Sequence, residues 1–406
     1  MLQKVRWESK LARRVLIHWV RFGPYHIARF RNAREFFMGN GLELVGLQIA
    51  QTDQVYSWRK SFDLDKWGIY TLFPGRVYEN IRYAELGKAL AAFIRRLSPD
   101  VVDISGYSAK DSLHLLSICS LYRKPIILMS DTKADDYPRK KLVENLKKHI
   151  IGNFSSAICG GKLHRDYLIS LGMSANRIFS GYDVVDNHYF ASQAEQARFT
   201  PFKYRHLPGL DNEVPFFLAS LRFIKRKNID GLVVAYQIYR EKAARLSEHT
   251  PWRLVILGDG EERGFIESNI QKLDIQGITL AGFHQIEDIP VYYGLAKAFI
   301  HPALREQWGL VVNEAMASGL PVIVSRVCGC VPDLVEHGVN GFTFDPENTA
   351  ELAEYMFLLN SEPELLERMG AASRVKISNW GLDRFARSLY CAVSVALGSS
   401  SQTNCS

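Results

Sequence analysis

The sequence predicts an α/β protein made of two Rossmann-like domains that face each other across a cleft. Two observations carry this prediction. Short apolar runs alternate with amphipathic segments along the chain, and this rhythm stops near residues 191–214 before it resumes. Such alternation is typical of βαβ units stacked into a parallel sheet. The length of 406 residues agrees, because single hydrophobic cores rarely grow beyond about 250–300 residues.

The first half contains apolar runs that fit buried strands. These are residues 14–20, 42–50, 101–105, 125–130, 156–160 and 177–181. Residues 79–97 carry apolar side chains at helical spacing between two of these runs. We therefore predict a first domain over residues 1–195. A polar linker with two prolines should follow over residues 196–213.

A second series of strands and helices begins after this linker. The predicted strands are residues 214–221, 252–258, 278–282, 298–304, 320–325 and 341–345. The predicted helices are residues 228–246, 261–273, 289–297, 309–318 and 349–359. We therefore predict a second domain over residues 214–380, a helix over 381–396 and a flexible tail over 397–406. Ligands of open α/β sheets bind at the carboxyl ends of the strands, so the chemistry belongs in the cleft between the domains.

Composition excludes several classes of protein. With 47% hydrophobic and 23% charged residues, the chain is neither disordered nor fibrous. No apolar run approaches the roughly 20 residues that a membrane span needs, and the N-terminus lacks the apolar stretch of a signal peptide. Six cysteines follow no disulfide or zinc framework. We therefore expect a cytoplasmic protein.

The stretch over residues 301–325 combines features of an anion-binding site. Gly309 and Leu310 mark the start of a predicted helix, where backbone N–H groups lack partners within the helix. Glu306 precedes this helix and Glu314 lies inside it. Carboxylates form short, strong hydrogen bonds with hydroxyl-rich ligands. Alone, two glutamates at this spacing also fit an ordinary surface helix.

A cluster of cations, Arg222 and residues 225–227, follows the first strand of the second half. Cations in a strand-to-helix loop suit a diphosphate, although a solvated basic turn would have the same sequence. Gly258 and Gly260 follow the next strand, but Gly264 falls one residue late for the dinucleotide fingerprint G-x-G-x-x-G. We therefore expect no nicotinamide or flavin cofactor.

Together these motifs resemble the family 4 glycosyltransferases, which are retaining enzymes of the GT-B fold. The resemblance extends from about residue 216 to residue 346. After Arg222 and Lys227 it comprises V-I-L-G-D-G, A-G-F, H-P-x-x-x-E-x-x-G-L-x-x-x-E-A-M-A-S-G-L-P-V-I-V-S and G-V-N-G-F-T-F-D-P, in family order and at family spacing. It implies a GT-B fold, with the C-terminal helix crossing back onto the first domain, and a nucleotide-diphosphate sugar as donor.

The resemblance also implies roles for the matched residues. The side chains of Arg222 and Lys227 would hold the donor's diphosphate, Glu306 would contact hydroxyls of the donor sugar, and Glu314 would contact the ribose. Backbone N–H groups would bind the same phosphates at Gly309, Leu310 and Val311. The remaining candidates for substrate binding are Gly258, Gly260, Gly282, Phe283 and His284, the last three near the nucleotide base.

The first half matches the family only loosely. Where members often carry a histidine at the end of a strand, this chain has Ser130 and Asp131. We therefore take His26, Ser130 and Asp131 as acceptor-side candidates, with His26 or Asp131 assuming part of the histidine's role. The family's N-G-V-D turn is replaced by YDVVD, which leaves Asp186 as the matching acid.

The reaction implied by the resemblance is retaining transfer of a hexose to a hydroxyl acceptor, such as a glycan or lipid-linked glycan. We expect no cofactor and no required metal, because cations and a helix N-terminus would stabilise the diphosphate. Asp63-Leu64-Asp65 matches the metal-binding D-x-D of another glycosyltransferase fold, but its polar surroundings favour a solvated loop. Three alternatives remain open: a nucleotide-sugar epimerase, a phosphorolytic enzyme and a catalytically idle sugar-nucleotide-binding protein.

Charge is unevenly distributed between the two halves. Residues 1–200 carry 30 Lys and Arg against 19 Asp and Glu, and the remainder carries 20 against 24. A basic first half suits an anionic partner, although surplus surface lysine explains it equally well. Residues 21–34 combine aromatic and basic side chains that could contact an anionic membrane or a lipid-linked acceptor, or form one solvated helix face. We expect no nucleic-acid partner, and peripheral attachment at the inner face of a membrane is one option.

Overall fold

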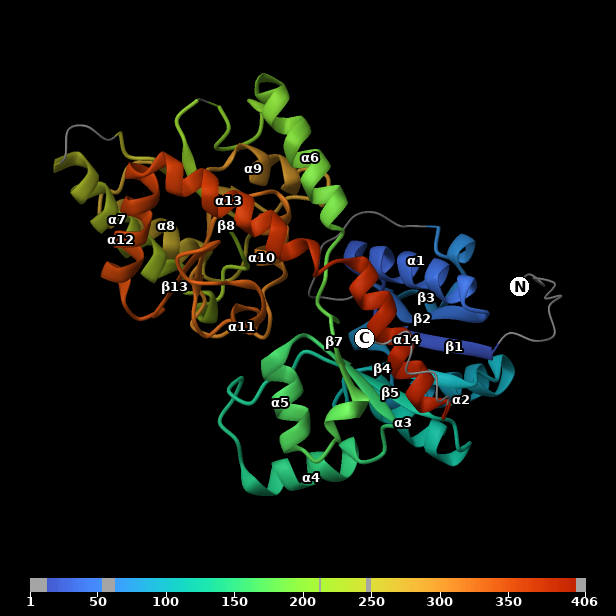
Figure 1. The fold of residues 1–406 in the computed structure, drawn as a ribbon. Coiled ribbons are helices and arrows are strands. Elements are labelled where there is room, and N and C mark those ends of the chain that lie inside the picture. The colour runs from blue at the N-terminus through green and yellow to red at the C-terminus, as the bar shows by residue number, and fades with distance from the viewer. Residues whose placement is uncertain (1–12, 53–62, 212, 246–249, 399–406) are drawn as a thin grey trace.

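The computed structural model describes residues 13–52, 63–211, 213–245 and 250–398, and places them in two α/β domains (Figure 1). Each domain is built around one sheet in which all the paired strands are parallel. Since parallel strands need crossover connections, helices lie between most successive strands and cover the sheets. The predicted fold class is therefore confirmed.

The first sheet has seven strands in the order β3-β2-β1-β4-β5-β6-β7. They are β1 (Arg13–Trp19), β2 (Leu42–Thr52), β3 (Ile69–Val77), β4 (Val101–Ser105), β5 (Ile126–Ser130), β6 (Ser156–Cys159) and β7 (Ile178–Ser180). The helices of this half are α1 (Pro24–Gly39), α2 (Tyr83–Leu97), α3 (Lys110–Leu121), α4 (Lys141–Ile151) and α5 (Lys162–Ser170). Helices α2 and α3 pack together over one apolar core, and α1 packs over another.

The second sheet has six strands in the order β10-β9-β8-β11-β12-β13. They are β8 (Phe216–Ser220), β9 (Arg253–Leu257), β10 (Ile278–Gly282), β11 (Ala298–His301), β12 (Val322–Ser325) and β13 (Gly341–Phe344). The helices are α7 (Ile229–Arg245), α8 (Arg263–Lys272), α9 (Ile289–Leu295), α10 (Leu310–Ala317), α11 (Val331–Leu334), α12 (Thr349–Ser361) and α13 (Pro363–Ser378). Helices α7 and α12 pack against each other beside this sheet.

The last strand of the first sheet, β7, ends at Ser180, well before the predicted linker begins at residue 196. Helix α6 (Asn187–Phe199) occupies the start of the predicted linker over 196–213 and the last residues of the predicted first domain. It buries Phe190, Ala194 and Ala197, and it packs against α9 and α10 of the second domain. The physical reason is that three side chains on one helix face suffice to bury that face, although polar residues surround them in the sequence.

Helix α14 (Leu382–Ala396) returns from the second domain to the first, as predicted (Figure 1). It packs on α1 and on β5, β6 and β7, and Ser156 Oγ donates a hydrogen bond to the carbonyl of Ala392 at 2.7 Å. The chain therefore passes between the domains twice, at residues 181–187 and 378–381. None of the helices in the described part of the chain combines the length and the apolar composition that a bilayer span requires.

Candidate active site

A cleft of about 760 Å³ lies between the two domains. Its first-domain wall comes from the loop after β1, the start of α1 and the loops after β5 and β7. Its second-domain wall comes from the loops after β8, β9, β10 and β11 and from the N-terminus of α10. Parallel strands bring all these loops to the carboxyl edges of their sheets, where α/β proteins bind ligands.

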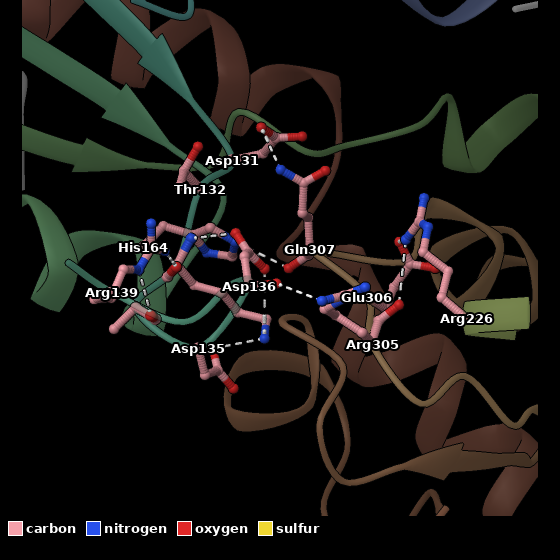
Figure 2. Close-up of polar contacts among 12 residues, drawn as sticks. Asp131, Thr132, Asp135, Asp136, Arg139, His164, Arg226, Arg305, Glu306 and Gln307 are labelled. Carbon is pink, nitrogen blue, oxygen red and sulfur yellow. Dashed lines mark hydrogen bonds and ion pairs between the residues drawn. The ribbon is translucent and has the colours of Figure 1, made fainter. Parts of the chain in front are cut away.

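A buried ion pair between Lys227 and Glu306 lies in the second-domain wall. The Nε2 atom of His301 is 3.1 Å from the Glu306 oxygen that Lys227 contacts, and Arg226 Nη1 is 3.7 Å from the other oxygen. Burial alone would raise the pKa of Glu306, but the Lys227 ammonium and His301 lower it below its usual value. Glu306 is therefore ionised, and Figure 2 shows it beside Arg226.

The N-terminus of α10 adjoins this ion pair. Gly309 precedes the helix with φ +102°, a conformation that other residues rarely adopt. The first backbone N–H groups of a helix have no intrahelical acceptor, and here Gly309, Leu310 and Val311 line the cleft. Asn313 of the same helix donates a hydrogen bond from Nδ2 to the carbonyl of Asp183 at 3.2 Å, which fixes α10 against the first domain.

Glu314 lies deeper in the cleft and is buried. Its Oε2 atom accepts a hydrogen bond from the hydroxyl of Tyr293 at 2.9 Å, and Tyr25 of the first domain also hydrogen-bonds to the carboxyl group. Burial raises the pKa of Glu314 to about 7, although the two tyrosines act in the opposite direction. The Glu314 carboxyl group is therefore hydrogen-bonded to one residue from each domain, and its raised pKa lies near neutral pH.

The loops after β9 and β10 form the far end of the second-domain wall. Gly258, Gly260, Phe283 and His284 line the cleft there, whereas Gly282 is not among the described lining residues. Gly282 instead supports the turn, because its carbonyl accepts a hydrogen bond from the N–H of Gly258 at 2.8 Å. The hydroxyl of Tyr292 lies 3.0 Å from Nε2 of His284 and holds the imidazole in place.

The first-domain wall begins with His26 and Arg29 of α1. Burial and the nearby cations Arg29 and Arg21 lower the pKa of His26 to about 3, so its imidazole is neutral. Its Nδ1 atom accepts a hydrogen bond from the N–H of Gly23 at 3.3 Å. The guanidinium of Arg29 is buried, and its Nε donates a hydrogen bond to the carbonyl of Val184 at 3.0 Å.

Two carboxyl groups, Asp131 and Asp183, complete this wall. Burial raises the pKa of Asp131 to about 6, and the negative charges of Asp136 and Glu306 add to this effect. Burial likewise raises the pKa of Asp183 to about 7, and the negative charges of Asp131 and Glu306 add to it. Arg29 acts in the opposite direction, with Nη2 3.9 Å from Oδ1 of Asp183. Asp131 Oδ1 lies 3.5 Å from Nε2 of Gln307 across the cleft (Figure 2).

Some predicted residues lie elsewhere. Ser130 is buried at the end of β5, where its Oγ accepts a hydrogen bond from the N–H of Thr132 at 3.3 Å, and it is not among the described lining residues. Asp186 caps α6 by accepting a hydrogen bond from the N–H of Tyr189 at 3.0 Å, so the acid that this turn supplies to the cleft is Asp183. Asp63 and Asp65 of the D-x-D segment are exposed and likewise lie outside the described cleft lining.

Residues 21–34 do not form one solvated helix face. Tyr25, His26 and Arg29 face the cleft, and the guanidinium of Arg31 lies over the ring of Trp67 at 4.1 Å. The sequence therefore missed Tyr25, Arg29 and Asp183 as cleft residues. The available signal was the segment YDVVD, which offers two acids, but spacing alone does not tell which of them faces the cleft.

Comparison with known proteins agrees with this architecture. Residues 203–376 match the model of a family described as "Glycosyl transferases group 1". An uncharacterised glycosyltransferase of Haemophilus influenzae is 31% identical over 158 residues, which are 39% of this chain and 43% of that protein. The alpha-monoglucosyldiacylglycerol synthase of Acholeplasma laidlawii is 24% identical over 335 residues, 78% of this chain and 80% of that protein. This chain thus spans less than half of the Haemophilus relative.

Solved structures show the same fold over nearly the whole chain. A glycosyltransferase of Rickettsia africae superposes with a TM-score of 0.72 at 16% identity, covering 95% of this chain and 98% of that one. The Anabaena protein Alr3699/HepE, solved in complex with UDP and glucose, superposes with a TM-score of 0.70 at 17% identity, covering 94% and 99%. The fold of this chain is therefore GT-B.

Proposed function

We propose that this protein is a retaining glycosyltransferase of family 4, which moves a hexose from a nucleoside-diphosphate sugar to a hydroxyl group of a glycan or lipid-linked acceptor. The observation that carries the proposal is the second-domain wall of the cleft. There the buried ion pair of Lys227 and Glu306 adjoins the open N-terminus of α10. The family match over residues 203–376 supports the same reading, and crystal structures of the Anabaena protein with UDP-glucose make UDP-sugars the first donors to test.

The donor would bind along the second-domain wall. Its diphosphate would lie between the cations at 222–227 and the N–H groups at Gly309, because oxyanions favour helix N-termini and cationic side chains. Glu306 would hold Lys227 in position and accept hydrogen bonds from hydroxyls of the sugar. Glu314 would receive the ribose hydroxyls. The base would lie by Phe283 and His284.

Chemistry would begin with loosening of the bond between the sugar and the diphosphate. Negative charge then grows on the diphosphate oxygens, and preorganised cations and backbone N–H groups stabilise this charge most strongly in the transition state. The acceptor hydroxyl would attack from the same side and pass its proton to the departing phosphate, so the configuration is retained. This path needs neither a metal nor a strong protein base.

The acceptor would bind along the first-domain wall. Arg29 and Asp183 line the cleft, and their buried Nη2 and Oδ2 atoms make no hydrogen bond to another described residue. A ligand that reached these two atoms would find one donor and one acceptor. A hydroxyl group can satisfy both at once, because it accepts one hydrogen bond and donates another. Neutral His26 and Asp131 would orient the rest of the acceptor. The groups that stand in for the missing family histidine would thus position the acceptor and would not remove a proton from it.

Thermal stability in the presence of nucleotide sugars tests the donor site. A donor present at about 100 times its Kd should raise the free energy of unfolding by about 2.7 kcal/mol. We expect this stabilisation with one UDP-, GDP- or ADP-sugar, unchanged by EDTA and weakened in Glu314→Gln. Absence of stabilisation by every donor at millimolar concentration, in folded protein, would contradict the proposal.

A second measurement separates the enzyme classes. The stabilising donor is incubated with hydroxyl acceptors, and the product is examined by NMR for the configuration of the new bond. A retained configuration supports the proposed reaction, and an inverted one contradicts it. Release of an epimerised nucleotide sugar without acceptor would indicate an epimerase, dependence on inorganic phosphate would indicate a phosphorolytic enzyme, and binding without turnover would indicate an idle binding protein.

A further inference from the structure

Helix α4 exposes large apolar side chains on the outside of the first domain. The exposed fraction is 85% for Leu142, 61% for Leu146 and 46% for Val143. Figure 1 shows α4 at the edge of the domain, after the segment that follows β5. Soluble proteins seldom concentrate leucines this exposed on one short helix, and such patches mark surfaces that contact something else.

The spacing of these residues gives α4 two different faces. Leu142 and Leu146 are four residues apart, so they lie on the same side of the helix, and Val143 is next to them. Ile150, one turn further along, is half-buried against the first-domain core. Glu144, the acid of this helix, belongs to the other side. It accepts hydrogen bonds from Lys147 Nζ and the hydroxyl of Tyr167, both at 2.8 Å, and it is therefore neutralised against the body of the domain.

Basic residues flank the apolar side. Lys140, Lys141 and Lys148 are all exposed. The exposed acid in the preceding loop, Asp135, has its charge balanced by Lys133 Nζ at 2.6 Å. None of these three lysines forms an ion pair with another described residue, so the outer surface of α4 presents leucine and valine flanked by lysine charges. We name this surface, which consists of Leu142, Val143 and Leu146 with Lys140, Lys141 and Lys148, the α4 face.

The chemistry of the α4 face selects one type of partner. Apolar side chains flanked by lysine match the boundary between anionic headgroups and acyl chains, where amphipathic helices lie in the plane of the membrane. A second copy of the chain docking symmetrically would bring the two sets of lysines together, which like-charge repulsion opposes. We propose that the α4 face docks on the surface of a bilayer containing anionic lipids.

Docking would also place the cleft beside the lipid. The loop that begins at Asp131 in the cleft wall ends at α4. Within this loop the carbonyl of Asp136 accepts a hydrogen bond from Arg305 Nη1 at 3.2 Å, and the same guanidinium lies 4.8 Å from the centre of the Tyr137 ring. Figure 2 shows Asp136 and Arg305 next to each other, with a dashed line for this hydrogen bond. The first-domain wall is thus linked to the proposed docking surface by nine residues or fewer.

Flotation of the whole protein with vesicles tests the proposal. We expect the protein to float with vesicles of equimolar phosphatidylcholine and phosphatidylglycerol, and not with phosphatidylcholine alone. Raising salt from about 0.1 M to about 1 M shortens the Debye length from about 10 Å to about 3 Å and should release much of the bound protein. Each lysine near an anionic surface contributes about fivefold to binding, so a Lys140→Gln, Lys141→Gln, Lys148→Gln variant should bind about 100-fold more weakly.

The apolar side requires its own variant and a matched control. We expect Leu142→Glu with Leu146→Glu to bind anionic vesicles at least tenfold more weakly than the wild type. The control is Leu121→Glu with Val375→Glu, whose side chains are 78% and 72% exposed on α3 and α13, and it should bind like the wild type. Equal melting temperatures would show that each variant is folded.

Three results would overturn the proposal. They are absence of flotation by folded wild-type protein, undiminished flotation of the Leu142→Glu, Leu146→Glu variant, and equal loss in the control variant. Self-association that disappears in the α4 variant, without vesicle binding by the wild type, would assign the α4 face to a second copy instead. None of these measurements depends on the proposed transferase activity, so either proposal can fail alone.

Discussion

At the scale of single residues, the charge of Lys227 is the feature with the clearest consequence. Its ammonium group neutralises Glu306 in a buried setting, and it would also neutralise the donor's diphosphate. We expect Lys227→Ala to lower turnover of the donor by about 100-fold or more, the scale of losing a transition-state charge contact. Steady-state release of the nucleoside diphosphate measures this loss.

The same substitution should destabilise the fold, because it leaves Glu306 buried with weaker partners. Breaking a buried ion pair from one side costs about 3–5 kcal/mol, which urea unfolding would detect. Lys225→Ala is the control, since Lys225 is exposed in the same short helix and is not among the described cleft residues. Near-normal turnover in Lys227→Ala would argue against a phosphate role.

A second prediction concerns pH and the acid pair. The pKa of Asp183 is raised to about 7 and that of Asp131 to about 6, while unfolded aspartates titrate near 4. Between these values the folded state holds protons that the unfolded state has released, so this contribution to stability falls as the pH rises from about 4 to about 7. The charged groups that act on the pair are Arg29, Glu306 and, for Asp131, also Asp136.

Asp183→Asn removes one of these titrations. We expect its free energy of unfolding to exceed that of the wild type by on the order of 2 kcal/mol at pH 8, with the difference disappearing near pH 4. Urea unfolding at a series of pH values measures it. A difference that does not change with pH would mean that Asp183 ionises normally in the folded protein.

The two walls of the cleft differed in how far the sequence could predict them. Glu306, Gly309 and Glu314 lie within one short stretch, so their proximity follows from a strand, a loop and a helix. Arg29 and Asp183 are far apart in the sequence and meet only because the strand order brings the ends of β1, β5 and β7 to one edge. The charges and the sequence spacing of Arg29 and Asp183 do not show that the two side chains lie close together.

At the scale of elements, the turn after β9 is built around glycine. Gly258 has φ +124°, and a Cβ atom there would lie 1.8 Å from the carbonyl oxygen of Leu221. We expect Gly258→Ala to cost roughly 3 kcal/mol of stability from strain and overlap, and to disturb this part of the second-domain wall. Chemical denaturation measures the first effect and binding of a nucleotide sugar the second.

The matched substitution lies in the following helix. Gly264, the glycine that falls one residue late for a dinucleotide fingerprint, lies in α8, where a Cβ atom would meet nothing within 4 Å. Gly264→Ala should therefore leave stability unchanged or raise it by up to about 1 kcal/mol, because alanine loses less backbone entropy in a helix. Equal effects of the two substitutions would contradict the assigned role of Gly258.

Most elements were predictable, since a strand buried on both faces reads as a continuous apolar run. Helix α13 was not predicted, and two further exceptions, β3 and α6, have identifiable physical causes. Strand β3 lies at the edge of its sheet, where Pro74 is tolerated although it cannot complete a hydrogen-bond ladder on both sides. Helix α6 buries Phe190 together with Ala194 and Ala197, and alanines do not stand out as an apolar stripe among polar neighbours.

At the scale of the whole molecule, α14 makes the stability of the first domain depend on the end of the chain. Phe385 is fully buried in α14 near Trp19 and Tyr182. We expect Phe385→Ala to cost about 3–5 kcal/mol, the scale of a large cavity in a core. Val375→Ala, at an exposed position of α13, should change stability by less than about 0.5 kcal/mol. Urea unfolding of both variants tests this dependence, and equal midpoints would contradict it.

The two passages of the chain between the domains meet at one point. The carbonyl of Asp183, in the first passage, accepts hydrogen bonds from Trp380 Nε1 of the second passage at 3.0 Å and from Asn313 Nδ2 at 3.2 Å. Asn187 Nδ2 donates a hydrogen bond to the carbonyl of Ile377 at 2.8 Å, which holds the start of α6 against the end of α13. A rotation of one domain against the other must therefore pivot close to Asp183. In such a rotation the residues at the outer rim of the cleft would travel farthest, and Asp183, which lies at the pivot, would move least.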